Sequence, residues 1–426
     1  MFIIYSLLYS LLFIFALPFY ALFRKLKRKS SIKLAERLGM RIKKYSAYGE
    51  KTIWIHAVSV GEVLAAKPLV MRIRKEYPNI PLIMSVTTET GHAAAASAYG
   101  DTVFIINFPF DFGFSVRKYL RIYDPQLVII METELWPRFC REVKKASIPL
   151  VLINGRISLT SFPHYKRLRF FIKEVLNCFD LLIVQTTQYK ERLLELGAAS
   201  KKIHIAPSLK YHKSNFDIDS KQKEKFISVT GIDKKDIVIT GGSTHQGEEE
   251  ILVNVFKTLS IEQPSLKLII APRRPERFGE VESLILKHGL LYKKMSAGEN
   301  TKPWRVLLVD RMGELKNCYA ASRIVFVGGS LIKHGGQNLL EAAAFSLPVI
   351  FGPHIYNFLE SADMLLDSGG GFMVRDEHEL RETCAFLLKN KLECETAGKA
   401  ARSVIDSRQG GLENIMMKIK KYLDNK

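Results

Sequence analysis

One carboxylate, Glu62, stands where the stretch "IHAVSVGE" (55–62) gives way to alanine-rich sequence. A carboxylate on such a strand-to-helix turn can act as a general base when a substrate hydroxyl lies within hydrogen-bonding reach. It can equally be a helix N-terminal acid that the helix dipole stabilises. A helix N-terminus predicts a lowered pKa for Glu62, which would keep the group ionised and ready to accept a proton.

Further polar residues follow apolar runs. Glu132 and Glu134 in "METELWP" could line an acceptor site, although helix caps or ion pairs explain them equally well. His56 follows the apolar run before Glu62, and we expect it to be a satisfied core or cleft residue and not a catalyst. Glu36 and Arg37 in "AERLG" either meet lipid headgroups or serve a structural role.

Three glycine-rich turns follow apolar runs in the second half of the chain. They are "TGGSTHQGE" (240–248), "DRMGELKN" (310–317) and "VGGSLIKHGGQNLLEAA" (327–343). Glycine there lets the backbone approach a ligand, and the N–H groups of a following helix can bind phosphate. None of the turns is a P-loop or a dinucleotide fingerprint. Together they predict a site for a nucleotide-like anion.

Side chains near these turns could complete such a site. Arg273 and Arg274 in "APRRPER" offer guanidinium groups for forked contacts with phosphate or carboxylate, or form a solvated basic turn. Asn338 and Glu341 stand three residues apart at a helix start. The Glu341 carboxylate could accept hydrogen bonds from a ribose diol, or simply interact with the helix N-terminus.

The elements that position these residues have the pattern of α/β architecture. From about Ile53 onward, short apolar runs alternate with amphipathic segments, which is typical of parallel sheets covered by helices. We predict two doubly wound, Rossmann-like domains facing a cleft, with ligands at the carboxyl ends of the strands. The predicted boundaries are 1–29 for a membrane anchor with its basic flank, 30–211 for the first domain, 212–226 for a polar linker and 227–426 for the second domain with a terminal helix.

The net charge and the N-terminal segment indicate which kind of partner the protein binds. Lys and Arg number 63 against 43 acids, a net charge of +20, which predicts an anionic partner. Residues 2–23 are uncharged, long enough for a hydrocarbon core of about 30 Å, and followed by five basic residues at 24–29. This pattern predicts an uncleaved anchor with the remainder in the cytoplasm and the basic flank on anionic lipid. Pro18 leaves spanning and monotopic insertion both open.

Other partner classes fit less well. The chain lacks interleaved aromatic and basic residues or a recognised nucleic-acid motif, so no nucleic-acid partner is expected. Its five cysteines are scattered without a C-x-x-C pair, so neither a metal site nor a disulfide framework is indicated. The oligomeric state is left open.

An ordered series of motifs covers nearly the whole chain. The motifs are "AERLG", "HAVSVGE", "TTETG", "PFDF", "ETELWP", "NGRIS", "GGSTHQGEEE", "PRRPER", "DRMGEL", "GGSLIKHGGQNLLEAA" and "GPHIYNF". In this order they resemble the 3-deoxy-D-manno-octulosonic acid (Kdo) transferases of lipopolysaccharide synthesis. The resemblance implies a GT-B glycosyltransferase of the inner membrane. Its first domain would take a lipid A precursor and its second would bind CMP-Kdo.

The resemblance also assigns roles to single residues. Glu62 matches the family's general base, which would activate the 6′-hydroxyl of the acceptor in an inverting transfer that needs no metal or other cofactor. The positions that match CMP contacts are Pro272, Arg273, Met312, Gly313, Glu314, Asn338, Leu339, Leu340 and Glu341. Ser243 and Glu248 resemble further donor-pocket positions. Lys210 stands where the family usually has a Gly-Asn-Leu-Lys sequence, but in this chain Pro207 and Ser208 replace the first two residues. Gln337 replaces a histidine that is common before Asn338.

Two rival readings remain. A two-domain nucleotide-sugar epimerase would share the architecture but would need no membrane anchor. A pseudoenzyme scaffold would not need Glu62 together with the glycine-rich turns. The number of Kdo residues transferred and the acyl preference of the acceptor have no motif that we can read.

Overall fold

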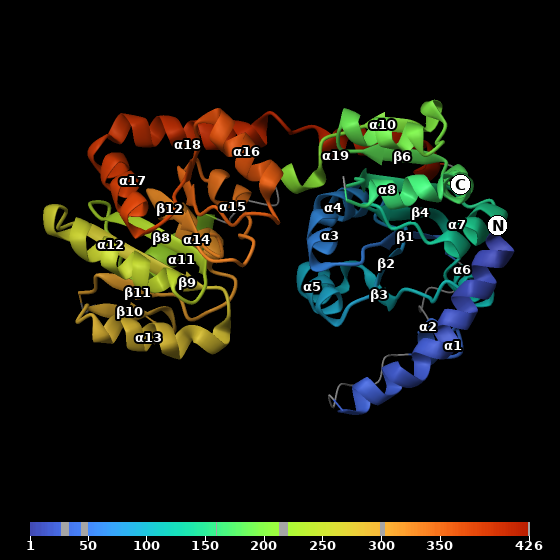
Figure 1. Cartoon of the computed structure of the whole chain (residues 1–426), viewed down its shortest axis with the longest axis horizontal. Coiled ribbons are helices and arrows are strands. Elements are labelled where there is room, and N and C mark those ends of the chain that lie inside the picture. Colours follow the sequence, from blue (N-terminus) through green and yellow to red (C-terminus); the bar gives the residue numbers. More distant parts are fainter. Residues whose placement is uncertain (27–33, 44–49, 159, 213–219, 299–302, 425–426) are drawn as a thin grey trace. The chain divides into compact units, whose positions relative to one another are not determined.

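The chain divides into two compact units. In the computed structural model, one unit comprises Met1–Asn215 and Gln409–Lys426, and the other comprises Phe216–Arg408. The structure describes residues 1–26, 34–43, 50–158, 160–212, 220–298 and 303–424. Each unit has its own parallel sheet with helices packed around it (Figure 1). The predicted α/β class with two Rossmann-like sheets is confirmed.

The sheet of the first unit has the order β3-β2-β1-β4-β5-β6-β7 within the described residues. Its strands are β1 (Thr52–His56), β2 (Leu82–Val86), β3 (Phe104–Asn107), β4 (Pro125–Met131), β5 (Leu150–Gly155), β6 (Leu181–Val184) and β7 (Ile203–Ile205). Alternate side chains of a strand face opposite sides of a sheet. Trp54 therefore enters the core on one face, while Ile53 and Ile55 enter the core on the other.

Helices cover both faces of this sheet. They are α1 (Phe2–Leu26), α2 (Leu34–Arg37), α3 (Val60–Ala65), α4 (Lys67–Glu76), α5 (Glu89–Tyr99), α6 (Gly113–Tyr123), α7 (Pro137–Lys145), α8 (Phe162–Arg167), α9 (Arg169–Asn177), α10 (Thr187–Glu195) and α19 (Gly411–Leu423). Residues of α6, α7 and α9 share the core that contains Trp54. Residues of α3, α4, α5 and α19 share the opposite core.

The second unit repeats the design with the strand order β10-β11-β9-β8-β12-β13-β14. The strands are β8 (Ile237–Thr244), β9 (Leu266–Pro272), β10 (Tyr292–Lys294), β11 (Val306–Leu308), β12 (Ile324–Val327), β13 (Val349–Phe351) and β14 (Gly371–Met373). The helices are α11 (Ser220–Thr230), α12 (Glu248–Glu262), α13 (Phe278–Lys287), α14 (Leu315–Ala320), α15 (Leu340–Ala343), α16 (Leu359–Ser368), α17 (Glu377–Lys389) and α18 (Lys391–Asp406).

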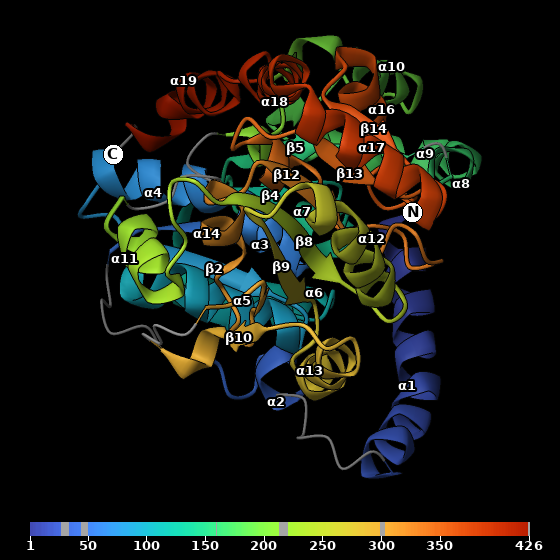
Figure 2. The ribbon, with the colours of Figure 1, turned by 90° about the vertical axis from the view of Figure 1, so that its left-hand side faces the viewer.

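The terminal helix corrects the predicted domain boundaries. We predicted it in the second domain, but α19 belongs to the first unit and lies beside α4 (Figure 2). Its apolar residues enter the first-unit core, and Gln409 Nε2 donates to the carbonyl of Tyr211 at 2.6 Å. After the second unit the chain returns to the first unit. The apolar residues of α19 recur at helical spacing on one face, and that face packs on the apolar core of the first sheet.

The predicted linker also differs. Residues 220–226 of the predicted linker form the start of α11, whose Phe226 is buried in the second unit. Residues 213–219 lie outside the described part of the chain.

Helix α1 occupies the predicted anchor. Within the described residues no helix is both long and apolar enough to cross a membrane, so a spanning anchor at 2–23 is not supported. One side of α1 contacts the rest of the first unit: Tyr5 donates to Asp111 at 2.8 Å, the rings of Tyr5 and Phe171 are tilted with centroids 5.6 Å apart, and Phe13 packs on Phe110. The other side exposes Ile3, Ile4, Leu7, Leu8, Leu11, Leu12, Ile14 and Phe15. The side chains of the predicted basic flank at 24–29 lie outside the described part.

The docking of α19 predicts where a core substitution acts. Ile419 is fully buried in the first-unit core, so Ile419→Ala should lower the free energy of unfolding of that unit by about 2–5 kcal/mol. Met417 is 66% exposed on the same helix, so Met417→Ala is the matched control, with a change within about 0.5 kcal/mol. Tryptophan fluorescence in a Trp304→Phe background follows Trp54 and Trp136 of the first unit during denaturation. An unshifted transition for Ile419→Ala would contradict this docking.

Candidate active site

The predicted site residues of the first unit lie beyond the carboxyl ends of its central strands. Glu62 follows β1, and Glu132 follows β4, the strand that pairs with β1. The chain order reverses between these two strands, which is the point where doubly wound sheets bind ligands. The sheet therefore brings together two acids that stand 70 positions apart in the sequence.

Glu62 is held by a capping box at the start of α3. Its Oε2 accepts from the backbone N–H of Val58 at 2.9 Å, and its Oε1 accepts from the Ser59 hydroxyl at 2.9 Å. The Ser59 oxygen in turn accepts from the backbone N–H of Glu62 at 3.3 Å. Ser59 is the N-cap and satisfies the Glu62 N–H, which the helix start leaves unpaired, while the Glu62 carboxylate reaches back to the N–H one residue before the cap. The N-terminal role weighed from the sequence is therefore present in the structure.

The pKa of Glu62 departs from the prediction. The helix N-terminus led us to predict a lowered pKa, but the pKa is raised. Burial is the largest cause, and Glu132 also raises the pKa, while the Val58 and Ser59 hydrogen bonds and Lys210 lower it. The prediction was wrong because only 7% of Glu62 is exposed, and the loss of water outweighs the favourable contacts.

Two cations flank the neighbouring acid. Glu132 accepts from Arg156 Nε at 2.7 Å and pairs with Lys210 Nζ at 2.8 Å. Its φ of 55° lies in the left-handed region, which is uncommon outside glycine and clusters at functional sites. Nearby, burial together with the charges of Glu62 and Glu132 raises the pKa of Glu134 to about 7. The result is a group of three carboxyls with two cations.

Pro207 and Ser208, which differ from the family sequence, leave the turn that carries Lys210 intact. Ser208 caps the short 3-10 turn Leu209–Tyr211 by accepting from the Lys210 N–H at 3.3 Å. The Leu209 N–H donates to the Asn154 side chain at 3.2 Å. Backbone contacts thus place Lys210 beside Glu132 with Pro207 and Ser208 in the sequence.

The remaining polar residues of this region serve the fold. His56 is fully buried, stacks on Phe108 at 3.8 Å and contacts the Ser85 hydroxyl at 2.9 Å. Burial lowers the pKa of His56 to about 3, and its Nε2 has no hydrogen-bond partner among the described residues, so His56 is a core residue but not the fully satisfied one that we expected. Glu36 accepts from the Asn107 amide at 2.9 Å, and Arg37 donates to the Phe108 carbonyl.

The predicted donor residues gather at the carboxyl edge of the second sheet. They follow the four neighbouring strands β11, β9, β8 and β12. The Arg273 N–H donates to the Thr244 carbonyl at 3.0 Å and ties the ends of β9 and β8 together. A β-carbon on Gly328 would lie 2.6 Å from the Ser243 carbonyl oxygen, so only glycine fits where β12 ends beside β8.

Asn338 and Glu341 contact each other as their spacing suggested. The Asn338 amide donates to Glu341 Oε1 at 3.1 Å, while its oxygen accepts from the Leu340 N–H at 3.2 Å. Burial raises the pKa of Glu341, and Arg273 lowers it as one of the smaller influences. The side chains of Leu339 and Leu340 are buried, so only their backbone is available to a ligand.

The turn after β11 has a different character. Met312 is 56% exposed, and Gly313 has a φ of 92°. Glu314 accepts from the Asn317 amide at 2.9 Å at the start of α14. This turn therefore offers backbone and side chains to solvent.

Glu248 is occupied by the protein backbone. Its Oε2 accepts from the N–H groups of His245 at 2.9 Å and Gly329 at 2.7 Å. Its Oε1 accepts from the N–H groups of Ser330 and Leu331, both at 3.0 Å. The side chain is fully buried and joins the turn after β8 to the turn after β12. In this structure the Glu248 carboxylate supports two glycine-rich turns.

Sequence reasoning missed several members of these clusters. His245 and His334 lie against each other with ring centroids 4.0 Å apart, and Gln337 contacts His245. Both histidines were visible inside glycine-rich turns, which was the available signal. Arg156 in "NGRIS" was also missed as a site residue, although it follows β5 as Glu132 follows β4.

Comparison with known proteins decides the family. Residues 33–213 match the family described as "3-Deoxy-D-manno-octulosonic-acid transferase (kdotransferase)". A "3-deoxy-D-manno-octulosonic acid transferase" of Haemophilus influenzae is 35% identical over 395 residues, 92% of this chain and 92% of that protein. The chain belongs to the Kdo transferase family. It is accordingly a glycosyltransferase, and Kdo transferases act in the lipopolysaccharide pathway at the cell envelope.

Other relatives agree with this family and its fold. A protein of the same name from Chlamydophila psittaci is 30% identical, covering 84% of this chain and 82% of that protein. A solved UDP-GlcNAc 2-epimerase from Neisseria meningitidis covers 87% of this chain and 100% of its own, with a TM-score of 0.61 at 14% identity. That likeness shows the fold alone, and it agrees with the two Rossmann-like units of this Kdo transferase.

The Glu248 contacts predict a stability effect confined to the second unit. Glu248→Gln would set an NH2 group against backbone N–H donors, so it should lower the free energy of unfolding by about 2–4 kcal/mol. The signal of Trp304, the tryptophan of the second unit, is the difference between fluorescence transitions measured with and without Trp304→Phe, and it reports the unfolding of this unit. Glu250→Gln in the same turn is the matched control because Glu250 is exposed. Equal stability of the two variants would show that the four contacts are not needed.

Proposed function

We propose that the protein transfers Kdo from CMP-Kdo to the 6′-hydroxyl of a lipid A precursor and releases CMP, with Glu62 as the general base. The single observation that carries the proposal is the placement of Glu62. The carboxylate is fixed at the switch point of the first sheet, beside a second acid that two cations hold. Membership of the Kdo transferase family supports the same reaction.

The chemistry of the step suits a buried carboxylate. The acceptor oxygen attacks the anomeric carbon of Kdo, the bond from that carbon to the CMP phosphate oxygen breaks, and the hydroxyl proton passes to Glu62. Attack opposite the leaving group inverts the anomeric centre, as in other inverting sugar chemistry. A raised pKa makes Glu62 a stronger base towards an alcohol, while Lys210 favours its ionised form.

The second unit is the proposed donor site. Arg273, exposed after β9, would contact the phosphate of CMP, and the Asn338–Glu341 pair would accept the ribose hydroxyls. Gly313 would let the backbone approach the base. CMP is a good leaving group, so electrostatic stabilisation by these groups needs no metal.

Helix α1 would hold the enzyme at the membrane that contains its acceptor. Aromatic residues on one side contact the first unit, so the opposite side is left with exposed Ile, Leu and Phe side chains. A helix with one apolar face can lie in the interface of a bilayer. The net charge of +20 would add attraction to anionic lipid. We therefore favour monotopic insertion on the cytoplasmic face of the inner membrane.

Substitution of Glu62 tests the catalytic proposal. Glu62→Gln keeps the size of the side chain but removes the base, so transfer should fall by at least about 100-fold. Mass spectrometry of a lipid A precursor incubated with enzyme and a CMP-Kdo supply measures the product. Thr186→Ala is the control, because it removes another helix cap of the same unit, away from Glu62. Near wild-type turnover by a folded Glu62→Gln variant would remove Glu62 as the base.

Charges on the exposed face of α1 test the membrane proposal. Leu7 and Leu11 are 66% and 55% exposed, and Leu7→Glu with Leu11→Glu should weaken binding to anionic phospholipid vesicles about tenfold or more. Leu392→Glu is the matched control, since Leu392 is 74% exposed on α18 of the second unit. Vesicle sedimentation measures the bound fraction. Undiminished binding of the double variant would argue against insertion of α1.

A further inference from the structure

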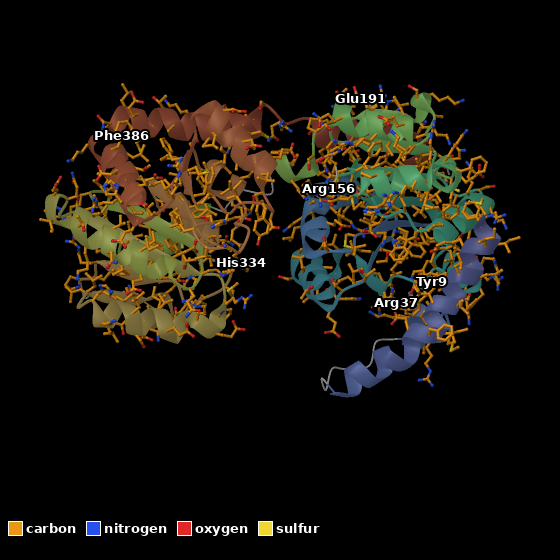
Figure 3. The ribbon with its side chains drawn as sticks, in the orientation of Figure 1. Tyr9, Arg37, Arg156, Glu191, His334 and Phe386 are labelled. Atoms are coloured by element: carbon orange, nitrogen blue, oxygen red, sulfur yellow. The ribbon has the colours of Figure 1, made fainter. Side chains whose placement is uncertain are left out.

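Three side chains converge above one glycine of the second unit. A β-carbon on Gly329 would lie 3.3 Å from Cδ2 of His245, 3.3 Å from Cδ2 of His334 and 3.5 Å from Nε2 of Gln337. The two imidazole rings are 4.0 Å apart, and the Gln337 amide is 3.2 Å from His245 Nε2. His334 belongs to the turn after β12 and is labelled in Figure 3. We name these three residues the histidine cluster.

The backbone around the histidine cluster is fixed by hydrogen bonds. The Gly336 N–H donates to the Gly329 carbonyl at 2.7 Å, which closes the turn that carries His334. The next loop, after β13, supports this turn: the Asn357 N–H donates to the Gly335 carbonyl at 3.1 Å. Glu248 joins the same turn to His245. The cluster is therefore held in place before any ligand binds.

The surroundings of the cluster are positively charged. Burial, and after it the charges of His334, Arg274, Arg277 and Arg273, lower the pKa of His245 to about 4. Of these arginines, Arg277 is engaged by Glu249 and Glu280. Arg273 and Arg274 form no ion pair within the described part of the chain, although Arg273 lies near enough to Glu341 to lower its pKa. The cluster thus lies among cations whose charge an anionic ligand would offset.

The acids at the start of α12 do not supply that anion. Both oxygens of Glu248 accept from backbone N–H groups, and Glu249 pairs with Arg277 at 2.6 Å. These carboxylates also neutralise the N-terminus of α12, so the helix itself offers little to an anion. Recognition of a negative charge here falls to the side chains of the histidine cluster and the two arginines.

We infer that the histidine cluster is the subsite that receives the carboxylate of the donor sugar. This inference rests on the proposed donor, CMP-Kdo, which carries a phosphodiester and, on the anomeric carbon, a carboxylate. Two anionic groups so close together require two neighbouring sets of donors. Arg273 after β9 suits the phosphate, and the cluster after the adjacent strands β8 and β12 suits the carboxylate. Imidazole and amide N–H groups can each donate to a carboxylate oxygen.

The inference is tested by comparing CMP-Kdo, which has the sugar carboxylate, with CMP, which lacks it. His334→Ala should raise the KM for CMP-Kdo by about tenfold to about 100-fold, the range for loss of a hydrogen bond to a charged group. The inhibition constant of CMP, which lacks the sugar, should change less than about twofold. His334→Gln retains an N–H donor and should recover part of the loss. Arg273→Ala, in contrast, should weaken both CMP-Kdo and CMP.

Controls separate this inference from general effects. Lys333→Ala removes an exposed cation from the same turn and should leave both constants near wild type. An unchanged KM for CMP-Kdo in His334→Ala, or an equal weakening of CMP, would overturn the carboxylate subsite. If the wild-type enzyme neither transfers Kdo nor is inhibited by CMP, the proposed function itself fails. A variant that changes the KM for CMP-Kdo but not the inhibition constant of CMP supports both the carboxylate subsite and the proposed function.

Discussion

The carboxyl edge of each sheet is built around one buried glutamate, which accepts from one backbone N–H in the first unit and from four in the second. Parallel strands that end at the same edge leave N–H groups without partners in their connecting turns, and burying such groups unpaired is costly. A carboxylate is the side chain with the most acceptor capacity for them. Glu62 meets this need after β1, and Glu248 meets it after β8. These two side chains hold the turns after β1, β8 and β12, which are three of the turns that could bind ligands.

Both glutamates accept hydrogen bonds from the backbone of a turn, but their carboxylates have different numbers of partners. Glu248 accepts four backbone hydrogen bonds from turns more than 80 residues apart in sequence, and none of its acceptor oxygens is left without a partner. Glu62 accepts one backbone N–H and one hydroxyl, both within its own turn. Burial raises the pKa of both carboxyls, against four backbone hydrogen bonds in Glu248 and against one backbone N–H and one hydroxyl in Glu62. The two carboxyls therefore differ in how many of their acceptor positions the protein occupies, and not in the direction of their pKa shifts.

The fold class could be predicted because it depends on patterns of neighbouring residues, which the sequence shows directly. Short apolar runs and amphipathic segments identified the strands and helices of both units, and ordered motifs identified the family. Both glutamates follow a glycine, in "VGE" and "QGE", and no local pattern separates their roles. The difference comes from Gly329, Ser330 and Leu331, which reach Glu248 only after β12 pairs with β8. The sign of the Glu62 shift was missed for the same reason, because burial is a property of the assembled unit.

The position of α19 shows how far composition can mislead about domain boundaries. Its apolar period predicted a packed helix correctly, but the period does not say which core the helix joins. Leu412, Ile415 and Ile419 are buried against the first sheet, and Gly411 lets the chain pass close to the Pro207 carbonyl, where a β-carbon would come within 2.2 Å. Pro207 and Gly411 thus meet across about 200 residues of chain, so the turn that presents Lys210 to Glu132 is braced by the C-terminal segment. The acid group at the edge of the first sheet is therefore supported by a segment that follows the whole second unit in the sequence.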